Sequence, residues 1–123
     1  MSRLSSWVDT YRSKVTTASN ALGRVRSGDR VYIHPGAAEP EELVRGLIER
    51  ASGLRNVELI HLLTLGDASY VKPEMEKHFR HTAMFVGANV REAVAQGRAD
   101  YIPVCLSEVP ALFTSGLLPI DVA

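Results

Sequence analysis

Residues 57–63 read Val-Glu-Leu-Ile-His-Leu-Leu, a run of strand length in which nearly every position is apolar. A strand with one face in water alternates between apolar and polar residues, whereas a strand covered on both faces does not. The run therefore predicts a central strand of a parallel sheet that is covered by helices on both sides. The segments around it support this interpretation.

Strand and helix patterns alternate along the chain. A strand is expected at residues 30–34, and a helix from about Pro40 to Ser52 begins with acidic residues that complement its positive end. Asn89, with Glu92 three residues later, predicts a capping box at the start of another helix. Further strands are expected at 82–86, 100–104 and 119–123. The alternation is typical of an α/β fold with a parallel, doubly covered, Rossmann-like sheet and flanking helices.

A helix is also expected before the sheet, over about residues 5–26. Its apolar residues recur at helical spacing along one side, and the turn at 27–29 ends it. These apolar residues are Trp7, Val8, Tyr11, Val15, Ala18, Leu22 and Val25. We expect one domain over residues 1–123, with this leading helix followed by a sheet region over about 30–123.

The composition is that of an ordinary globular domain. Fourteen basic residues balance fourteen acidic ones, and 46% of residues are hydrophobic, so neither disorder nor nucleic-acid binding is supported. Cys105 is the only cysteine, which excludes an internal disulfide and fits a reducing compartment. Because the sequence shows no secretory signal and no membrane-length apolar run, we expect a cytoplasmic protein with no membrane partner.

The chain ends inside the expected fifth strand, at residues 119–123, with no polar tail after it. Domain boundaries normally lie in exposed linkers, so we expect a sheet truncated within this strand rather than one completed by a short edge strand. The edge of an incomplete sheet has unpaired backbone groups. We therefore expect self-association into a homo-oligomer or binding to a complementary domain.

Loops with glycine follow the expected strands and lead into helices. In open α/β sheets, ligands bind at the carboxyl ends of the strands. The loops at 34–39 and 86–91 offer backbone amides and positive helix ends to a carboxylate or phosphate. Arg91, just inside a helix start, either calls for an anionic partner or faces solvent. Glycine is also common in such turns for conformational reasons alone, so both interpretations of this edge stay open.

Catalytic and metal-binding patterns are sparse. No dinucleotide-binding or Walker motif is present, and His78-x-x-His81 with Cys105 does not match a zinc pattern, so no metal is expected. His61 lies in an apolar strand and is expected to be a hydrogen-bonded core residue. Cys105 lacks an evident base and is expected to be a buried thiol rather than a nucleophile.

Six segments occur in one order: VYIHPGAAEP at 31–40, HLLTLG at 61–66, HFRH at 78–81, FVGANVR at 85–91, RADYIP at 98–103 and SEVP at 107–110. Together they cover nearly the whole chain. This ordered set resembles the N-terminal half of the acetyl-CoA hydrolase/transferase family, and is most similar to its 4-hydroxybutyrate CoA-transferases.

The resemblance implies two related α/β domains that transfer CoA from an acyl-CoA to a short-chain carboxylate, such as acetate or 4-hydroxybutyrate, by way of a glutamyl-CoA thioester. The nucleophilic glutamate and the oxyanion loop belong to the C-terminal domain in that family. The resemblance therefore implies no catalytic residue in this chain, no cofactor beyond coenzyme A as substrate, and a C-terminal CoA-transferase domain as partner. The implied pocket lining is Gly36, Ala37, Thr64, Gly66, Gly87, Asn89 and Arg91.

Two other functions stay open on the sequence. The first is a non-catalytic α/β binding or partner module. The second is a small thioester hydrolase that uses Cys105 or Ser107, although Ser107 lacks the Gly-x-Ser-x-Gly elbow of the α/β hydrolases. If the resemblance holds, the 123-residue chain by itself is expected to be inactive.

Overall fold

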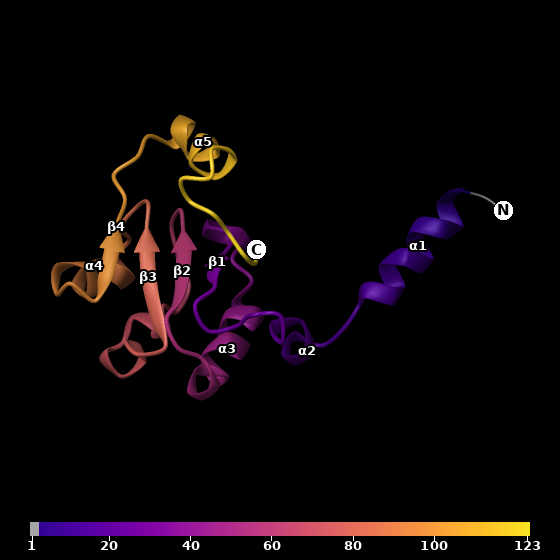
Figure 1. Ribbon diagram of the computed structural model, residues 1–123, viewed down its shortest axis with the longest axis horizontal. Coiled ribbons are helices and arrows are strands. Elements are labelled where there is room, and N and C mark those ends of the chain that lie inside the picture. Colours follow the sequence, from indigo (N-terminus) through magenta and orange to yellow (C-terminus); the bar gives the residue numbers. More distant parts are fainter. Residues whose placement is uncertain (1–2) are drawn as a thin grey trace.

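A parallel sheet forms the centre of the computed structural model, which describes residues 3–123 (Figure 1). Its strands are β1 (Arg30–Tyr32), β2 (Val57–His61), β3 (Phe79–Ala83) and β4 (Ala99–Tyr101). They lie in the order β1-β2-β3-β4, and each neighbouring pair is parallel. The predicted α/β class with a parallel sheet and flanking helices is confirmed. All strand ends that lead into the next helix therefore lie at one edge of the sheet.

The connecting helices pack on one face of this sheet. They are α2 (Ala18–Leu22), α3 (Glu41–Glu49), the 3-10 helices η3 (Ser69–Val71) and η4 (Pro73–Met75), and α4 (Ala88–Ala95). The strand register places Val31, Leu59, His81 and Ala99 side by side on that face. These side chains are buried, and the main hydrophobic core includes Val31, Leu59 and residues of α2, α3 and α4.

The opposite face of the sheet is divided into two halves. Toward the carboxyl edge, α5 (Val109–Thr114) packs over Ile60 and Met84 in a second apolar cluster. Toward the other edge, polar side chains pair across the strands: Glu58 accepts from Arg30 at 2.7 Å and from Thr82 at 2.7 Å. The apolar run at 57–63 is thus buried by helices on one face and by α5 on part of the other.

The bounds of all four strands differ from those expected: β1 ends at Tyr32 rather than 34, and β2 ends at His61 rather than 63. β3 covers Phe79–Ala83 rather than 82–86, because Phe79 and His81 point into the core while Arg80 between them points outward. Inward and outward side chains alternate in any strand, but the charged Arg80 interrupts the apolar run that would mark the start of β3 in the sequence. β4 covers Ala99–Tyr101 rather than 100–104, and Pro103, which has no N–H to donate, follows its end.

The last residues of the chain lie beside β1. In place of the strand expected at 119–123, a single parallel bridge joins Val122 to Val31, and the Tyr32 N–H donates to the Val122 carbonyl oxygen at 2.9 Å. The sheet is thereby extended on the side of β1 that faces away from β2. Figure 1 shows this segment descending from α5 to β1.

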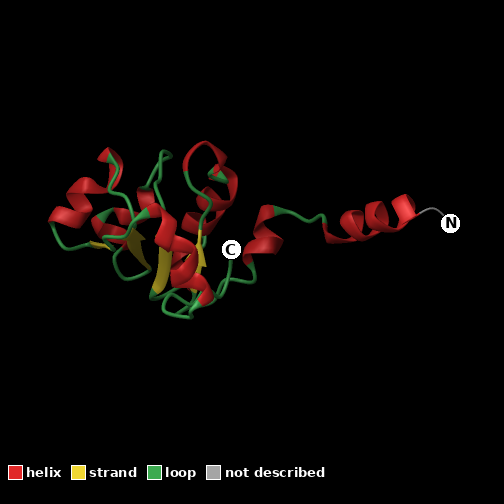
Figure 2. Ribbon diagram, turned by 90° about the horizontal axis from the view of Figure 1, so that it is seen from above, coloured by secondary structure: helices red, strands yellow, loops and turns green. Residues whose placement is uncertain are grey.

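The prediction of a single leading helix over about residues 5–26 is wrong. The structure has α1 (Arg3–Lys14) and α2, separated by three residues, and Thr17 caps α2 by accepting from the Asn20 N–H at 3.2 Å. Residues 15–17 are all β-branched, which disfavours helix at the junction. Leu22 and Val25 join the core, whereas Trp7, Tyr11 and Val15 remain 59–64% exposed. Helix α1 projects away from the sheet (Figures 1 and 2).

Within residues 3–123, no helix has both the length and the apolar character needed to cross a membrane.

Candidate functional site

Three loops meet at the carboxyl edge of the sheet. The loop after β1 contains the 3-10 helix η1 (Gly36–Ala38), and its Gly36 N–H donates to the Leu63 carbonyl oxygen in the loop after β2 at 2.9 Å. Gly36 has φ of +65°, a left-handed conformation that favours glycine. The first two loops are therefore joined through the backbone at a position where glycine is required for conformational reasons.

A carboxylate ties the same two loops together. Oε2 of Glu39 accepts from the Thr64 hydroxyl at 2.9 Å, from the Leu65 N–H at 3.2 Å and from the Gly66 N–H at 3.1 Å. A Cβ on Gly66 would lie 3.0–3.2 Å from the Glu39 carboxyl group, so glycine at 66 allows the close approach. The turn at Thr64–Gly66 thus directs three donors at one oxygen atom.

Asn89 holds this turn from the other side. Its Nδ2 donates to the carbonyl oxygens of Thr64 at 3.3 Å and of Gly66 at 2.9 Å. The predicted capping box of Asn89 and Glu92 is therefore wrong: α4 has Gly87 as its N-cap, and no side chain caps it. The carbonyls of the neighbouring loop compete successfully for the amide of Asn89.

Gly87 makes room for this arrangement. A Cβ at that position would lie 2.9 Å from Oδ1 of Asn89 and 3.2 Å from the Thr64 carbonyl oxygen. Gly66 and Gly87 are thus required for close packing, whereas their φ angles are not in the left-handed region. The loops after β1, β2 and β3 form one interlocked unit.

The seven residues predicted to line a pocket are distributed along this edge. Five of them, Gly36, Thr64, Gly66, Gly87 and Asn89, belong to the interlocked unit. Ala37 follows Gly36 in η1, and Arg91 lies in α4; both are exposed. Their contact with a substrate stays a prediction.

Glu39 is the residue at this edge that the sequence did not single out. Its position next to Pro40 predicts that it complements the positive end of the following helix, as Glu41 and Glu42 do, but its carboxylate reaches the loop after β2 instead. A signal was available: the loops Ala38-Glu39-Pro40 and Thr64-Leu65-Gly66 follow neighbouring strands of a parallel sheet, which brings the carboxylate and the glycine turn to one edge.

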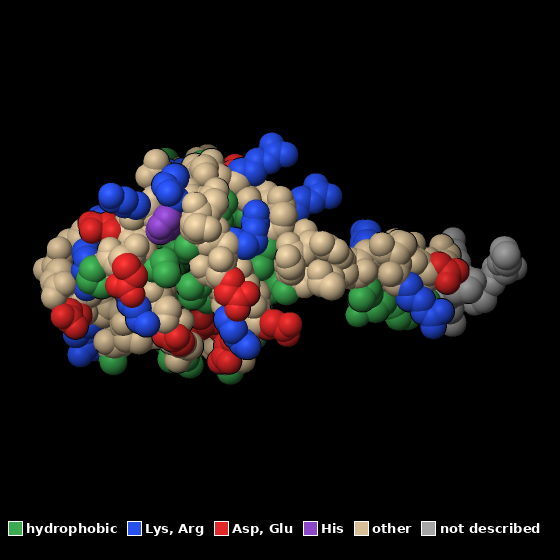
Figure 3. All heavy atoms as spheres, turned by 90° about the horizontal axis from the view of Figure 1, so that it is seen from below, with side chains coloured by type: hydrophobic (Ala, Val, Ile, Leu, Met, Phe, Trp, Pro, Cys, Tyr) green, Lys and Arg blue, Asp and Glu red, His purple; other side chains and the backbone are tan. Residues whose placement is uncertain are grey.

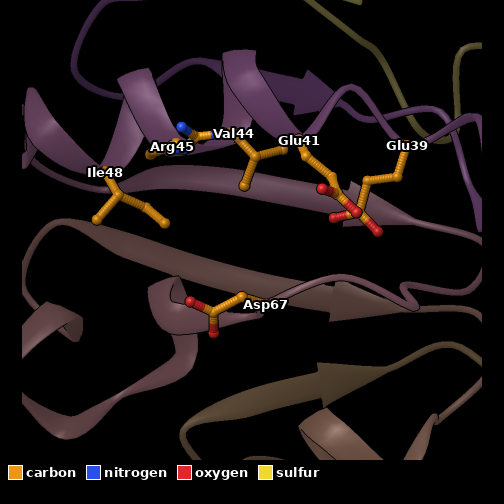
Figure 4. A pocket seen from close by; sticks show the side chains of 6 residues that line it. All are labelled: Glu39, Glu41, Val44, Arg45, Ile48 and Asp67. Atoms are coloured by element: carbon orange, nitrogen blue, oxygen red, sulfur yellow. The ribbon is translucent and has the colours of Figure 1, made fainter.

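A hollow of about 210 Å³ opens beside Glu39 (Figure 4). The carboxylates of Glu39, Glu41 and Asp67 border it together with Arg45, and Val44 and Ile48 of α3 complete its lining. A larger, more open hollow of about 570 Å³ is lined by Gly66 and Asn89 and by the segment of η3 and η4. Gly36, Thr64 and Gly87 line neither hollow, so the predicted residues share an edge but not one cavity.

A buried aromatic cluster supports the turn from inside the core. His61, Tyr70 and His81 are nearly inaccessible, and the Tyr70 hydroxyl lies 3.0 Å from Nε2 of His61. Nδ1 of His81 lies 3.1 Å from the Leu59 carbonyl oxygen. Burial lowers the pKa of both histidines to about 4, and the neighbouring His61 adds to the effect on His81. The prediction that His61 is a hydrogen-bonded core residue is confirmed.

The other candidate groups do not assemble into a site. His78 bonds to the Leu54 carbonyl oxygen at 2.8 Å, away from the buried His81. Among residues 3–123, no three His, Cys, Asp or Glu side chains are placed to hold a metal ion. Cys105 is exposed rather than buried, because it lies in the loop after β4, where its sulfur accepts from the backbone N–H of Glu108.

Comparison with known families identifies the fold. Residues 2–123 match the acetyl-CoA hydrolase/transferase N-terminal domain. The chain belongs to the acetyl-CoA hydrolase/transferase family. Within this family, the match covers the interlocked loops and the flanking helices alike.

Two curated members of the acetyl-CoA hydrolase/transferase family illustrate the relationship. The 4-hydroxybutyrate coenzyme A transferase of Clostridium kluyveri is 39% identical over 117 residues, which are 95% of this chain and 27% of that protein. The succinyl-CoA:acetate/propanoyl-CoA:succinate CoA transferase of Fasciola hepatica is 38% identical over 110 residues, 88% of this chain and 23% of that protein. The chain thus spans about a quarter of the length of these relatives.

Solved structures show the same architecture. The 4-hydroxybutyrate CoA-transferase from Porphyromonas gingivalis superposes with a TM-score of 0.69 at 26% identity, over 93% of this chain and 24% of that one. RipA from Yersinia pestis superposes with a TM-score of 0.73 at 23% identity, over 87% of this chain and 27% of that one. The second likeness bears on the fold alone.

Proposed function

We propose that this chain forms the N-terminal part of an acyl-CoA:carboxylate CoA-transferase and lines its acyl pocket. The reaction would transfer CoA between an acyl-CoA and a short-chain carboxylate, such as acetate or 4-hydroxybutyrate. Family membership and the CoA-transferase names of its relatives support the reaction class. The interlocked edge formed by Gly36, Glu39, Thr64, Gly66 and Asn89 is the structural observation that carries the proposal.

This edge combines polar donors with exposed apolar side chains. Leu65 after β2, Phe85 after β3, Tyr101 at the end of β4 and Leu106 after it are all 44–65% exposed. Exposed apolar groups gathered at one place commonly mark a binding or interaction surface. A pocket for a short acyl group needs such apolar walls with a few oriented polar groups. We propose that a C-terminal CoA-transferase domain closes the pocket from the opposite side.

The nucleophile is proposed to come from that second domain. Cys105 and Ser107 are exposed in the loop after β4, and the sulfur of Cys105 contacts the Glu108 backbone rather than a base. A thiol or hydroxyl without a neighbouring base is weakly activated. We therefore propose that this chain shapes and polarises the pocket, and that the chain alone does not turn over acyl-CoA.

A chimeric enzyme tests this proposal. Residues 1–123 would replace the matching segment of the Clostridium kluyveri transferase, and CoA transfer from acetyl-CoA to 4-hydroxybutyrate would be measured. We expect a folded, active chimera. A control chimera carries the corresponding segment of the Fasciola hepatica relative, which is 38% identical to this chain. A folded but inactive chimera beside an active control would contradict the proposal.

The 123-residue chain alone is assayed in parallel for thioester hydrolysis and CoA transfer. We expect no turnover above background. Hydrolysis that disappears in Cys105→Ala or Ser107→Ala would instead identify a small thioester hydrolase.

A further inference from the structure

We propose that the turn at Thr64–Gly66 is a binding site for a small monocarboxylate, and that Glu39 of the same chain occupies it in this structure. A free carboxylate with one negative charge, of the size of acetate, would take the place of the Glu39 carboxyl group when that side chain withdraws. The use of the site in catalysis rests on the proposed function, whereas the site itself follows from the geometry of this chain.

The donors of this turn are suited to a carboxylate. Two consecutive backbone N–H groups, of Leu65 and Gly66, and the Thr64 hydroxyl converge on one oxygen at 2.9–3.2 Å. Successive amides that point to one side of a turn form a concavity that binds anions, and hydrogen bonds to a charged acceptor are stronger than those to a neutral one. The turn therefore recognises a carboxylate oxygen and needs no basic side chain for it.

The donors are held in place independently of Glu39. Asn89 binds the carbonyl oxygens of Thr64 and Gly66, which orients the turn from the opposite side. Thr64 is only 2% exposed, so its hydroxyl is fixed by packing as well. Because these supports come from α4 and the core, the three donors keep their positions when the Glu39 carboxylate leaves.

Glu39 itself is attached in a way that permits exchange. The hydrogen bonds described for its carboxylate all reach Oε2, while Oε1 lies toward the Cα of Gly66 and contributes close contact only. The side chain can leave the turn by rotation about its own side-chain bonds, while the two loops stay joined through the Gly36 N–H and the Leu63 carbonyl oxygen. A ligand that presents one carboxylate oxygen reproduces the three hydrogen bonds that the Glu39 carboxylate accepts.

Two effects limit what can bind. Glu39 is tethered beside the turn, and a tethered group competes at an effective concentration of roughly millimolar or more. Glu41 and Asp67 border the adjoining hollow, with Arg45 as the one basic side chain in its lining (Figure 4). A second carboxylate on the ligand would meet these like charges. The site should thus prefer acetate to succinate, and only weakly admit either while Glu39 is present.

Nuclear magnetic resonance on the full chain tests the site directly. Backbone amide shifts of the wild type, Glu39→Ala and the control Glu41→Ala would be followed during titration with sodium acetate, with sodium chloride at equal ionic strength as reference. In Glu39→Ala we expect saturable shifts of the Leu65 and Gly66 amides, with an apparent Kd at least tenfold lower than in wild type. Glu41→Ala should retain the weak response of the wild type, and succinate should bind Glu39→Ala less tightly than acetate.

A folded Glu39→Ala chain whose amide shifts at 65 and 66 do not change with acetate would overturn the proposal. Equal shifts in the wild type, Glu39→Ala and Glu41→Ala would overturn it as well. If Glu39→Ala does not fold, Glu39→Gln serves instead, because it keeps the size of the side chain and removes the charge. Acetate should bind Glu39→Gln more tightly than wild type, and an unchanged Kd overturns the site. The chimera assay is independent of this test. An active chimera together with no acetate-dependent shifts refutes this site but not the proposed function. An inactive chimera together with acetate-dependent shifts refutes only the proposed function.

Discussion

Asn89 and Gly66 are joined by a hydrogen bond of 2.9 Å from the side-chain amide of Asn89 to the Gly66 carbonyl oxygen. Residue 89 lies in the first turn of α4, so the bond connects the helix after β3 to the loop after β2. Together with the bond to the Thr64 carbonyl oxygen, it turns the N–H groups of that loop toward Glu39. The edge of the sheet is thereby organised by side chains from both neighbouring loops.

Replacing Asn89 by Ala should loosen this turn. Loss of two hydrogen bonds at a partly exposed position should cost about 1 kcal/mol of unfolding free energy and should accelerate hydrogen exchange at the amides of 65 and 66. Urea unfolding and exchange measured by NMR check this. Gln96→Ala at the end of the same helix is the control, since it removes a side-chain bond to Glu92 and two bonds from Arg98. Unchanged exchange in Asn89→Ala would show that the turn is held without this side chain.

Gly66→Ala should destabilise the chain because of Glu39. The new methyl group would lie 3.0–3.2 Å from the carboxyl group and displace it, at a cost of about 1–2 kcal/mol. The same substitution in a Glu39→Ala background should be nearly neutral, which a double-mutant cycle measures. Gly53→Ala is the control, because a Cβ there meets nothing within 4 Å. Equal costs in both backgrounds would exclude the proposed contact.

The two buried histidines should make stability depend on pH. Their pKa is lowered by burial from 6.5 to about 4, so the folded chain keeps them neutral while the unfolded chain protonates them. Above pH 6.5 both histidines are neutral in either state, and their full contribution to the free energy of unfolding is present. As pH falls toward 4, this free energy decreases by roughly 3 kcal/mol for each histidine. Urea unfolding at pH 7.5, 6 and 5 checks this decline.

The double variant His61→Gln with His81→Gln supplies the control for that experiment, because it removes both buried imidazoles and should flatten the pH dependence. Imidazole protons of His61 and His81 that titrate near pH 6.5 in the native chain would contradict the lowered pKa values.

Helix α1 should be dispensable for folding and involved in association. Trp7 and Tyr11 in this helix and Val15 just after it are exposed and recur every four residues, which makes an apolar stripe. Figure 3 shows hydrophobic side chains along one side of the helix. Deleting residues 1–15 should leave the cooperative unfolding of the sheet region intact. Light scattering should show that the full chain self-associates at increasing concentration and that the triple serine variant of the stripe does so less. Asp9→Ser is the control, and a full chain that stays monomeric throughout would refute the prediction.

Cys105 should react in the native chain. Its side chain is exposed, so a water-soluble disulfide reagent should modify it at nearly the same rate with and without denaturant. Cys105→Ala provides the blank, since it removes the only thiol. Strong protection in the absence of denaturant would mean that the thiol is covered in solution, for example by self-association.

The class of the fold and the sheet edge that carries the candidate site are both encoded in local features of the sequence. The apolar run at 57–63, the alternating helix patterns and the glycine turns depend on local periodicity and backbone freedom, which the order of the residues records directly. Parallel strands with helical connections place all the strand exits at one edge, so the positions of Gly36, Thr64 and Gly87 followed from their order in the chain.

Which side chains meet at that edge depends on contacts between residues that are distant in the sequence. Glu39 and Thr64 lie 25 residues apart, and so do Asn89 and Thr64, so their bonds depend on strand register and helix placement rather than on local pattern. The carbonyls of the loop after β2 outcompeted the helix end for Asn89. Local propensity is overridden wherever a distant group offers better hydrogen bonds or packing, and sequence spacing carries no record of those distant groups.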